Sequence, residues 1–435
     1  MSKSICLVVL TCAIAFRPSV SFAQHEHPPL SPQPPTADQH QHPSPSNATA
    51  PAPMGREGSG TSRLPDVTPM YAIHGTFGEW QTMVHGNGFL QYFRDATPRG
   101  QRQFGSINWF MVSGRRRAAS GAMTLRGMFS LEPLTIRDCG YPDLLASGEV
   151  CEGQPIVDRQ HPHDLLMEIS ATYDRQLSSG LNLQIYGGVA GEPALGPVAF
   201  PHRPSALTNP LAPISHHWLD ASHITFGVLT AAIADRHWKM EGSLFNGREP
   251  DAERYDINLA ALDSYSGRVT FLPTPRVAVQ ISAGHLAEAE EHDLERVDVD
   301  RVTASAIYHV PRANGGLWAT TVAWGRNHEE GEAAHALLAE STWSFADRDV
   351  VFARAEVVQK SSHDLRLDDV DERFNVAKLQ VGYSRFLAPL AGWRAGIGGS
   401  VSIGIVPDGL SATYGGRVTP GGAVFLVVRP ASSMH

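Results

Sequence analysis

Histidine and aspartate residues with the ligand chemistry of a transition-metal site are concentrated between positions 158 and 223. Six of the chain's twenty histidines lie there, with Asp158, Asp164 and Asp220 among them. The candidate metal ligands are His161, His163, His202, His216, His217, His223 and Asp220. Neutral imidazole and carboxylate groups bind Zn, Cu, Ni or Fe. The spacing matches no single metal motif, so metal binding is a hypothesis that the surrounding elements must support.

The N-terminus indicates export. Lys3 is followed by an apolar stretch from Ile5 to Phe16 and by Ser21-Phe22-Ala23, which together have the pattern of a cleaved signal peptide at 1–23. Loss of Lys3 and Arg17 changes the formal net charge from −9 to −11. A chain this acidic is not expected to bind nucleic acid.

The two cysteines beyond residue 23 are expected to pair. Cys139 and Cys151 are separated by eleven residues in a region that contains Gly and Pro. In an oxidising compartment this arrangement predicts a disulfide-closed loop. The spacing lacks a CxxC unit, which makes a metal-ligand role for these cysteines the weaker alternative.

Residues 24–70 are predicted to be a disordered Pro/His-rich periplasmic segment. They carry eleven of the 31 prolines and few aliphatic residues. Such a segment buries too little apolar surface to offset its ordering entropy. Its candidate metal ligands are His25, His27, His40 and His42. A weak metal collector and a solvated spacer are both consistent with this composition.

From about residue 80 onward, segments of roughly ten to thirteen residues alternate apolar and polar side chains, the period of a β-strand. The polar face carries mid-strand charges at Arg268, Arg301, Glu340, Arg354, Glu356 and Lys378. This face suits a water-containing lumen, and the apolar face suits lipid. No apolar run of 18 residues follows the signal peptide, so spanning helices are not expected. The sequence therefore predicts an all-β fold, a transmembrane antiparallel β-barrel over residues 71–435.

About 16 strands are expected, with 14 as the alternative. Seven connections are short, including Leu177–Gly180, and they alternate with longer polar ones. Outer-membrane barrels have short periplasmic turns and long extracellular loops. The localisation inferred is the cell outer membrane, with lipid as a partner and both termini in the periplasm.

In this topology the histidine-rich loops flank the adjacent strands 164–176 and 181–192 and can approach each other. One hypothesis is a metal site, with a copper or zinc ion as the bound species. The other is a plug, because Pro162, Pro201 and Pro204 stiffen the loops enough to constrict a pore without metal. An enzyme is not expected. Ser222 and His223 are adjacent in a predicted strand and would point to opposite faces, unsuited to proton transfer.

The His-bearing, Pro-rich segment with His25, His27, His40 and His42, joined to a C-terminal barrel, resembles the architecture of copper-resistance outer-membrane proteins of Gram-negative bacteria. The resemblance implies copper handling. We therefore expect passage or handling of a small solute, with copper or zinc as the favoured case. The alternatives are a general porin-like channel with His/Pro-rich constriction loops and a structural surface barrel without transport.

Overall fold

The computed structural model describes residues 57–178, 180–292, 295–312, 315–345, 348–367, 372–431 and 433–434. The predicted signal peptide and the four tail histidines lie outside the described residues. Within this part of the chain, no helix has the length and apolarity needed to cross a bilayer.

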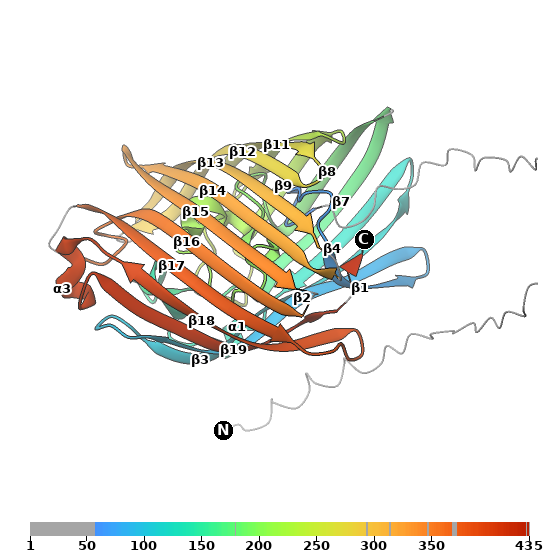
Figure 1. Ribbon diagram of the computed structural model, residues 1–435. Coiled ribbons are helices and arrows are strands. Elements are labelled where there is room, and N and C mark those ends of the chain that lie inside the picture. The colour runs from blue at the N-terminus through green and yellow to red at the C-terminus, as the bar shows by residue number, and fades with distance from the viewer. Residues whose placement is uncertain are drawn as a thin grey trace, which may run out of the picture. The chain divides into compact units, whose positions relative to one another are not determined.

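Sixteen strands of the described chain form a closed antiparallel barrel, as predicted (Figure 1). Neighbours in sequence pair with each other, and the last strand pairs with the first, from Gly421↔Asp95 to Val428↔Gly88. The barrel strands are β2 (Trp80–Asp95), β3 (Arg102–Ala118), β4 (Gly121–Phe129), β7 (Leu166–Ser178), β8 (Leu181–Gly191), β9 (Thr225–Ala234), β10 (Trp238–Phe245), β11 (Ser264–Thr274), β12 (Val277–His292), β13 (Glu295–Pro311), β14 (Leu317–Glu329), β15 (Glu332–Phe345), β16 (Asp349–Ser361), β17 (Arg373–Phe386), β18 (Trp393–Ile405) and β19 (Val418–Pro430).

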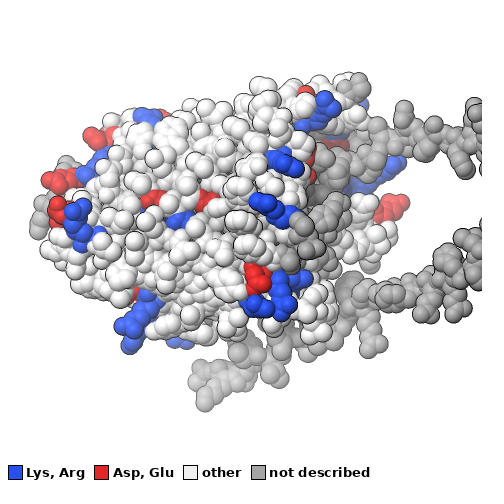
Figure 2. Space-filling model, in the orientation of Figure 1, with Lys and Arg blue, Asp and Glu red and all other residues white. Residues whose placement is uncertain are grey.

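The two faces of each strand follow the alternation in the sequence. In β16, Arg354 and Glu356 are buried inside, whereas Val351 and Val357 are exposed outside. An outward row of Val, Leu and Ile is the surface that lipid chains require, and the backbone polar groups are paired by the closed ladder. Charged residues gather mainly towards the two ends of the face seen in Figure 2, leaving a largely uncharged surface between them.

Two elements extend the barrel seam and were not predicted. The strand β1 (Met70–Phe77) pairs with the start of β2, from Ala72↔His85 to Phe77↔Trp80. The short β20 (Ser433–Met434) pairs with β1. The edge of β2 is therefore shared, because β19 covers its C-terminal half and β1 covers its N-terminal half.

The connections at one end of the barrel are short, as expected, but two at the other end are shorter than predicted. The β12–β13 and β14–β15 pairs continue as long hairpins through regions expected to be loops. The long connections contain the remaining elements: α1 (Glu132–Thr135), β5 (Tyr141–Cys151), β6 (Gln154–Gln160), η1 (Phe200–His202), α2 (His216–Leu219), η2 (Ala221–His223), η4 (Asp408–Leu410) and α3 (Ser411–Tyr414).

The lumen is filled by three segments, which together we call the plug: residues 57–69, 130–165 and 192–224. Most residues of 192–224 are buried, and the β5–β6 hairpin within 130–165 contacts the wall through β5. The disulfide predicted between Cys139 and Cys151 is present in this hairpin segment, with Cα atoms 6.0 Å apart. The cavities beside the plug have volumes of about 20, 10 and 40 Å³, space for single water molecules.

Candidate functional site

The wall of the barrel holds the plug through buried ion pairs centred on Arg203. Arg203 Nε lies 2.7 Å from Glu340 Oε1 on β15, and Nη1 lies 2.6 Å from Asp220 Oδ2. Glu340 also pairs with Arg354 on β16, at 3.0 Å. All four side chains are buried. Buried charges are tolerated only when paired and hydrogen-bonded, so this network fixes the 192–224 loop against the wall.

The predicted lumen charges face inward, but the plug covers them. Arg354 Nη1 donates to Leu211 O at 2.8 Å, and Glu356 Oε1 accepts from Ser215 Oγ at 2.7 Å. Lys378 pairs with Asp143 of the β5–β6 hairpin. The expectation of solvated lumen charges is therefore wrong for the conformation described, because the loops fold inward and replace water as the partner of the wall.

Arg268 and Arg301 complete the set of lumen charges. Arg268 Nε pairs with Glu241 Oε2 at 2.8 Å, and its Nη1 donates to Gly196 O in the plug. Arg301 Nε donates to Asn327 Oδ1 at 2.9 Å, and Asn327 in turn donates to the carbonyl of His217. Even these strand residues are thus connected to the plug.

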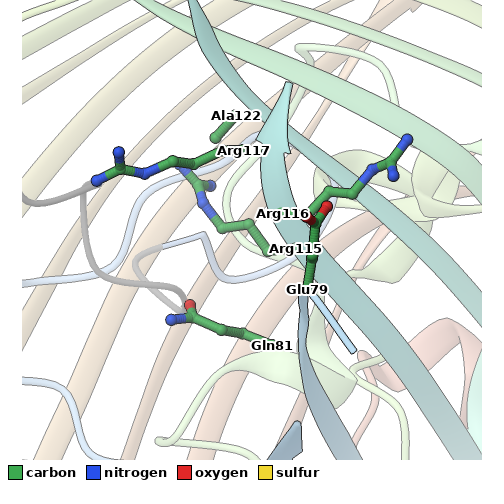
Figure 3. A pocket seen from close by; sticks show the side chains of 6 residues that line it. All are labelled: Glu79, Gln81, Arg115, Arg116, Arg117 and Ala122. Atoms are coloured by element: carbon green, nitrogen blue, oxygen red, sulfur yellow. The ribbon is translucent and has the colours of Figure 1, made fainter. Parts of the chain in front are cut away.

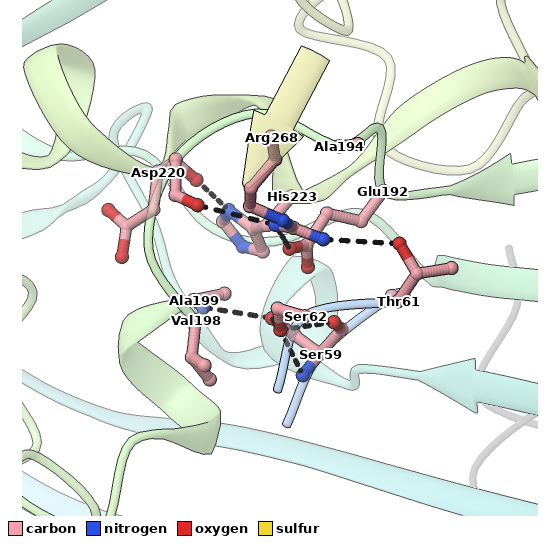
Figure 4. A network of polar contacts seen from close by, with 12 residues as sticks. Ser59, Thr61, Ser62, Glu192, Ala194, Val198, Ala199, Asp220, His223 and Arg268 are labelled. Atoms are coloured by element: carbon pink, nitrogen blue, oxygen red, sulfur yellow. Dashed lines mark hydrogen bonds and ion pairs between the residues drawn. The ribbon is translucent and has the colours of Figure 1, made fainter. Parts of the chain in front are cut away.

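Part of the segment 57–69, placed by the sequence in the disordered segment, is buried inside the barrel: Ser59, Thr61 and Ser62 lie beside residues of the 192–224 loop (Figure 4). Ser59 Oγ accepts from Ala199 N at 2.8 Å, and Arg268 Nη2 donates to Thr61 Oγ1 at 3.1 Å. Gly60, at φ +49°, lies so close to Glu192 that an added Cβ would be 2.7 Å from the Glu192 Cβ. The small Ser and Thr residues of this segment form hydrogen bonds with polar groups inside the lumen. The composition of the segment does not show whether its hydroxyl groups are bonded to protein or to water.

Three of the predicted metal ligands converge. One ligand atom of each of His161, His216 and His217 lies within 4.8 Å of the others. His161 follows β6, and the other two begin α2, so the group joins the 130–165 and 192–224 segments of the plug. We call these three residues the histidine triad.

Each triad residue has a carboxylate beside one ring nitrogen. His216 Nδ1 lies 2.8 Å from Asp220 Oδ1, and His217 Nδ1 lies 3.0 Å from Glu249 Oε1. Glu149 Oε1 lies 3.2 Å from His161 Nε2. Asp220, predicted to be a ligand, is instead held by Arg203 and orients His216.

The other predicted ligands surround the triad at different distances. The His223 ring lies 5.2 Å from the His216 ring and 5.3 Å from the His163 ring, measured between centroids. His163 Nδ1 lies 2.9 Å from Glu132 Oε1. His202 is further along the lumen, with its centroid 4.3 Å from Trp109 and 6.1 Å from His85.

Sequence reasoning missed Glu132, Glu149, Glu249 and His85 as neighbours of these histidines. Glu249 comes from the β10–β11 connection and His85 from β2, far from residues 158–223 along the chain. Of these four residues, only Glu132 and Glu149 could have been suspected from the sequence, because they are acidic residues in the loop that also contains His161. The approach of Glu249 depends on where loops from different strand pairs meet, which local spacing does not encode.

Burial keeps most of these imidazoles neutral. It lowers the pKa of His161, His202 and His223 well below the ordinary value, and it lowers that of His216 against the opposing effect of Asp220. For His163 burial also disfavours the charged form, but the Glu132 carboxylate outweighs it and the pKa is raised. His163 is therefore suited to an ion pair, and the neutral imidazoles retain a lone pair for a ligand.

A separate pocket of about 350 Å³ lies where the short β3–β4 turn meets the start of β2 (Figure 3). Its lining residues are Glu79, Gln81, Arg115, Arg116, Arg117 and Ala122. Arg115 pairs with Asp174 at 2.9 Å, and the Arg116 guanidinium lies over the Trp80 ring at 4.8 Å. These two cations already have partners, so the pocket gives weaker support for a site than the triad.

No protein-family model matches the sequence, and no curated protein matches it. Two solved structures are similar to the chain in fold. An anion-selective porin from Comamonas acidovorans aligns with 80% of this chain and 99% of its own at 9% identity and a TM-score of 0.50. Salmonella typhi OmpF, in a complex with daunomycin, aligns with 82% of this chain and 100% of its own at 9% identity and a TM-score of 0.51.

The chain thus has a porin-like barrel fold. At this identity the likeness concerns the fold alone. The sequence comparisons give no support to the resemblance to copper-resistance outer-membrane proteins.

Proposed function

We propose that this protein is an outer-membrane, porin-like channel for small solutes whose lumen is closed by the plug in the conformation described. The observation that carries the proposal is the charged inner wall beneath the plug, formed by Arg268, Glu340, Arg354, Glu356 and Lys378. A polar interior occurs in barrels with a water-filled channel and in barrels plugged by loops. A wall of this kind becomes a hydrated passage when the loops move outward.

The proposed orientation places the short turns and both termini in the periplasm, after removal of the signal peptide 1–23. The His/Pro-rich segment that follows would then be periplasmic. The proposed orientation is supported by the asymmetry between short connections, such as residues 179–180, and long ones, such as 192–224.

Conductance in planar bilayers tests the channel proposal. The unaltered protein should conduct little, and a variant in which residues 194–221 are replaced by a short Gly/Ser linker should conduct strongly. A matched control shortens 255–262, a mostly exposed part of the β10–β11 connection. Equal, negligible conductance from all three, with heat-modifiable migration on gels showing folded barrels, would overturn the proposal.

A finer proposal concerns the solute, which we infer to be a copper or zinc ion. The convergence of His161, His216 and His217 inside the lumen favours it over an unselective porin. Proteoliposomes containing a Glu340→Gln variant, which weakens the attachment of the plug to the wall but keeps all three histidines, and an internal metal-sensitive dye test this idea. Faster entry of Zn²⁺ than of Mg²⁺ is expected. Equal rates for both cations and for neutral sugars would favour the general channel instead.

A further inference from the structure

We propose that His161, His216 and His217 bind one resident divalent transition-metal ion, Zn²⁺ or Cu²⁺, that ties the two largest segments of the plug together. The proposed function describes a solute that passes. This inference describes an ion that stays and stabilises the closed plug. Only the effect of the bound ion on channel opening rests on the proposed function, because metal binding can be measured without any flux through the channel.

The geometry of the triad is close to that of a metal site. Zn–N distances of about 2.0–2.1 Å in a tetrahedron place ligand nitrogens about 3.3 Å from one another. The triad atoms lie within 4.8 Å, so ring rotations and small shifts of the loops bring them to ligand spacing. Three imidazoles with one further position open is an established zinc coordination set.

The triad also has the outer contacts that orient metal-binding histidines. Metal-bound imidazole normally donates its second N–H to a carboxylate or carbonyl, which fixes the ring and raises its basicity. Asp220 takes this role for His216, and the Glu249 carboxylate lies 3.0 Å from His217 Nδ1, where a small rotation of the ring would give His217 the same support. Asp220 is itself held by Arg203, so the support for His216 extends to the barrel wall.

A glycine makes room for one of the three rings. Gly148, at φ +124°, lies against His217 so closely that an added Cβ would be 2.2 Å from the ring atoms Cε1 and Nε2. Any side chain at this position would displace the imidazole. The β5–β6 hairpin is therefore shaped around the His217 ring.

A fourth buried imidazole lies next to the triad with an unused nitrogen. His223 Nδ1 bonds to the Asp220 carbonyl at 2.8 Å, but its Nε2 has no hydrogen-bond partner among the described residues. A buried polar atom without a partner costs free energy unless water or an ion satisfies it. His223 also lines a cavity of about 10 Å³ with His202 and Glu192, so a water molecule there or an ion beside His216 could satisfy this nitrogen.

The donor set determines the class of metal. Imidazole nitrogens suit Zn²⁺ and Cu²⁺, whereas Mg²⁺ and Ca²⁺ prefer oxygen ligands. Cys139 and Cys151 are joined in a disulfide and supply no thiolate. The site should therefore select a borderline divalent ion over Mg²⁺ or Ca²⁺.

The experiment uses the full-length chain with His25, His27, His40 and His42 replaced by Asn, so that the N-terminal segment does not contribute binding. After treatment with chelator, Co²⁺ is added as a spectroscopic probe and then displaced with Zn²⁺. We expect one equivalent of Co²⁺ with a nitrogen-rich visible spectrum and full displacement by Zn²⁺. His161→Gln and His217→Gln should each abolish the spectrum, and Glu249→Gln should weaken binding by about 10-fold or more.

His335→Asn is the matched control, because His335 packs on Trp324 of the neighbouring strand and lies outside the plug. It should bind like the parent. Heat-modifiable migration establishes that each variant is folded, and Glu249→Gln keeps the test valid if a triad variant does not fold. Binding of no metal by the folded parent, or of one full equivalent by the folded His161→Gln/His217→Gln double variant, would overturn the proposal.

Conductance of the same proteins separates this inference from the proposed function. If the loop-shortened protein conducts while the folded parent binds no metal, the resident-ion proposal is wrong and the channel proposal stands. If the parent binds one equivalent but no variant conducts, the channel proposal is wrong and the metal site stands.

Discussion

Arg203 of the plug and Glu340 of the barrel wall form an ion pair of 2.7 Å in which both side chains are buried. The two residues are 137 positions apart in the sequence. This ion pair holds the loop between β8 and β9 inside the lumen, against the barrel wall. Ser205 Oγ also donates to Glu340 Oε1 at 2.9 Å, so the carboxylate satisfies two groups of the same loop.

Loss of this carboxylate should release the plug. Glu340→Gln leaves Arg203 buried with one fewer anion, and breaking a buried pair in this way costs about 3–5 kcal/mol. We expect more frequent channel openings and faster proteolysis within 192–224. Single-channel recording and limited proteolysis measure the two effects.

Arg385→Gln is the control for that variant. Arg385 pairs with Asp349 at 3.2 Å, but its side chain is 52% exposed. Exposed pairs contribute about 0–1 kcal/mol, so this change should leave opening and proteolysis unaltered. Equal effects of the two variants would contradict the role assigned to Glu340.

The disulfide should stabilise the β5–β6 hairpin rather than the barrel. It closes a loop of 13 residues, counting both Cys139 and Cys151, for which the chain-entropy estimate is up to about 3 kcal/mol. In Cys139→Ser/Cys151→Ser, residues 141–160 should become sensitive to protease, while heat-modifiable migration of the barrel persists. Two free thiols found by mass spectrometry in protein purified without reductant would refute the bridge.

The plug should loosen as the pH rises through about 8, because of Glu192. Burial raises the pKa of this carboxyl group from 4.5 to about 8, although Arg268, 4.0 Å away, opposes the rise. The folded state therefore favours the protonated acid. The stability that Glu192 contributes is complete at a pH below its pKa in the unfolded chain. This stability is lost as the pH rises to the pKa that Glu192 has in the folded protein.

Hydrogen exchange of residues 57–62 and 192–199 as a function of pH measures this effect. The protection factors, which correct the exchange rates for their intrinsic rise with pH, should fall between about pH 5 and 9, and Glu192→Gln should flatten this profile. The charged and titratable groups that act on or near Glu192 come from β4, β7, β8, β11 and the plug: Arg126, Glu168, Tyr186, Arg268 and Asp220. A profile unchanged by Glu192→Gln would assign the pH response to one of these groups.

The topology predicts where proteases reach the protein on intact cells. Cleavage is expected within 246–257, where residues 251–253 are exposed, and within 361–373. The turn at 179–180 should remain uncut, because it lies at the opposite end of the barrel. Cleavage confined to the short turns would invert the proposed orientation.

Alternation of apolar and polar side chains determined the barrel strands from sequence alone. The strand predicted at 164–176 is β7 (Leu166–Ser178), and the strand predicted at 181–192 is β8 (Leu181–Gly191). This pattern is local, because successive side chains point to opposite faces of a strand and one face must meet lipid. The pairing of Cys139 with Cys151 was also predictable, since only a short loop separates them.

Only the tertiary structure decided what fills the lumen. The polar sequence of residues 57–69 is equally compatible with a solvated tail, and its place inside depends on partners such as Arg268 and Ala199. The sequence concentrated six histidines in one region, but it did not select His161, His216 and His217 as the group that converges. That selection requires α2 and the end of β6 to meet inside a closed barrel. Buried ion pairs such as Arg203–Glu340 bring them there, because a charged wall without water must take its partners from the loops.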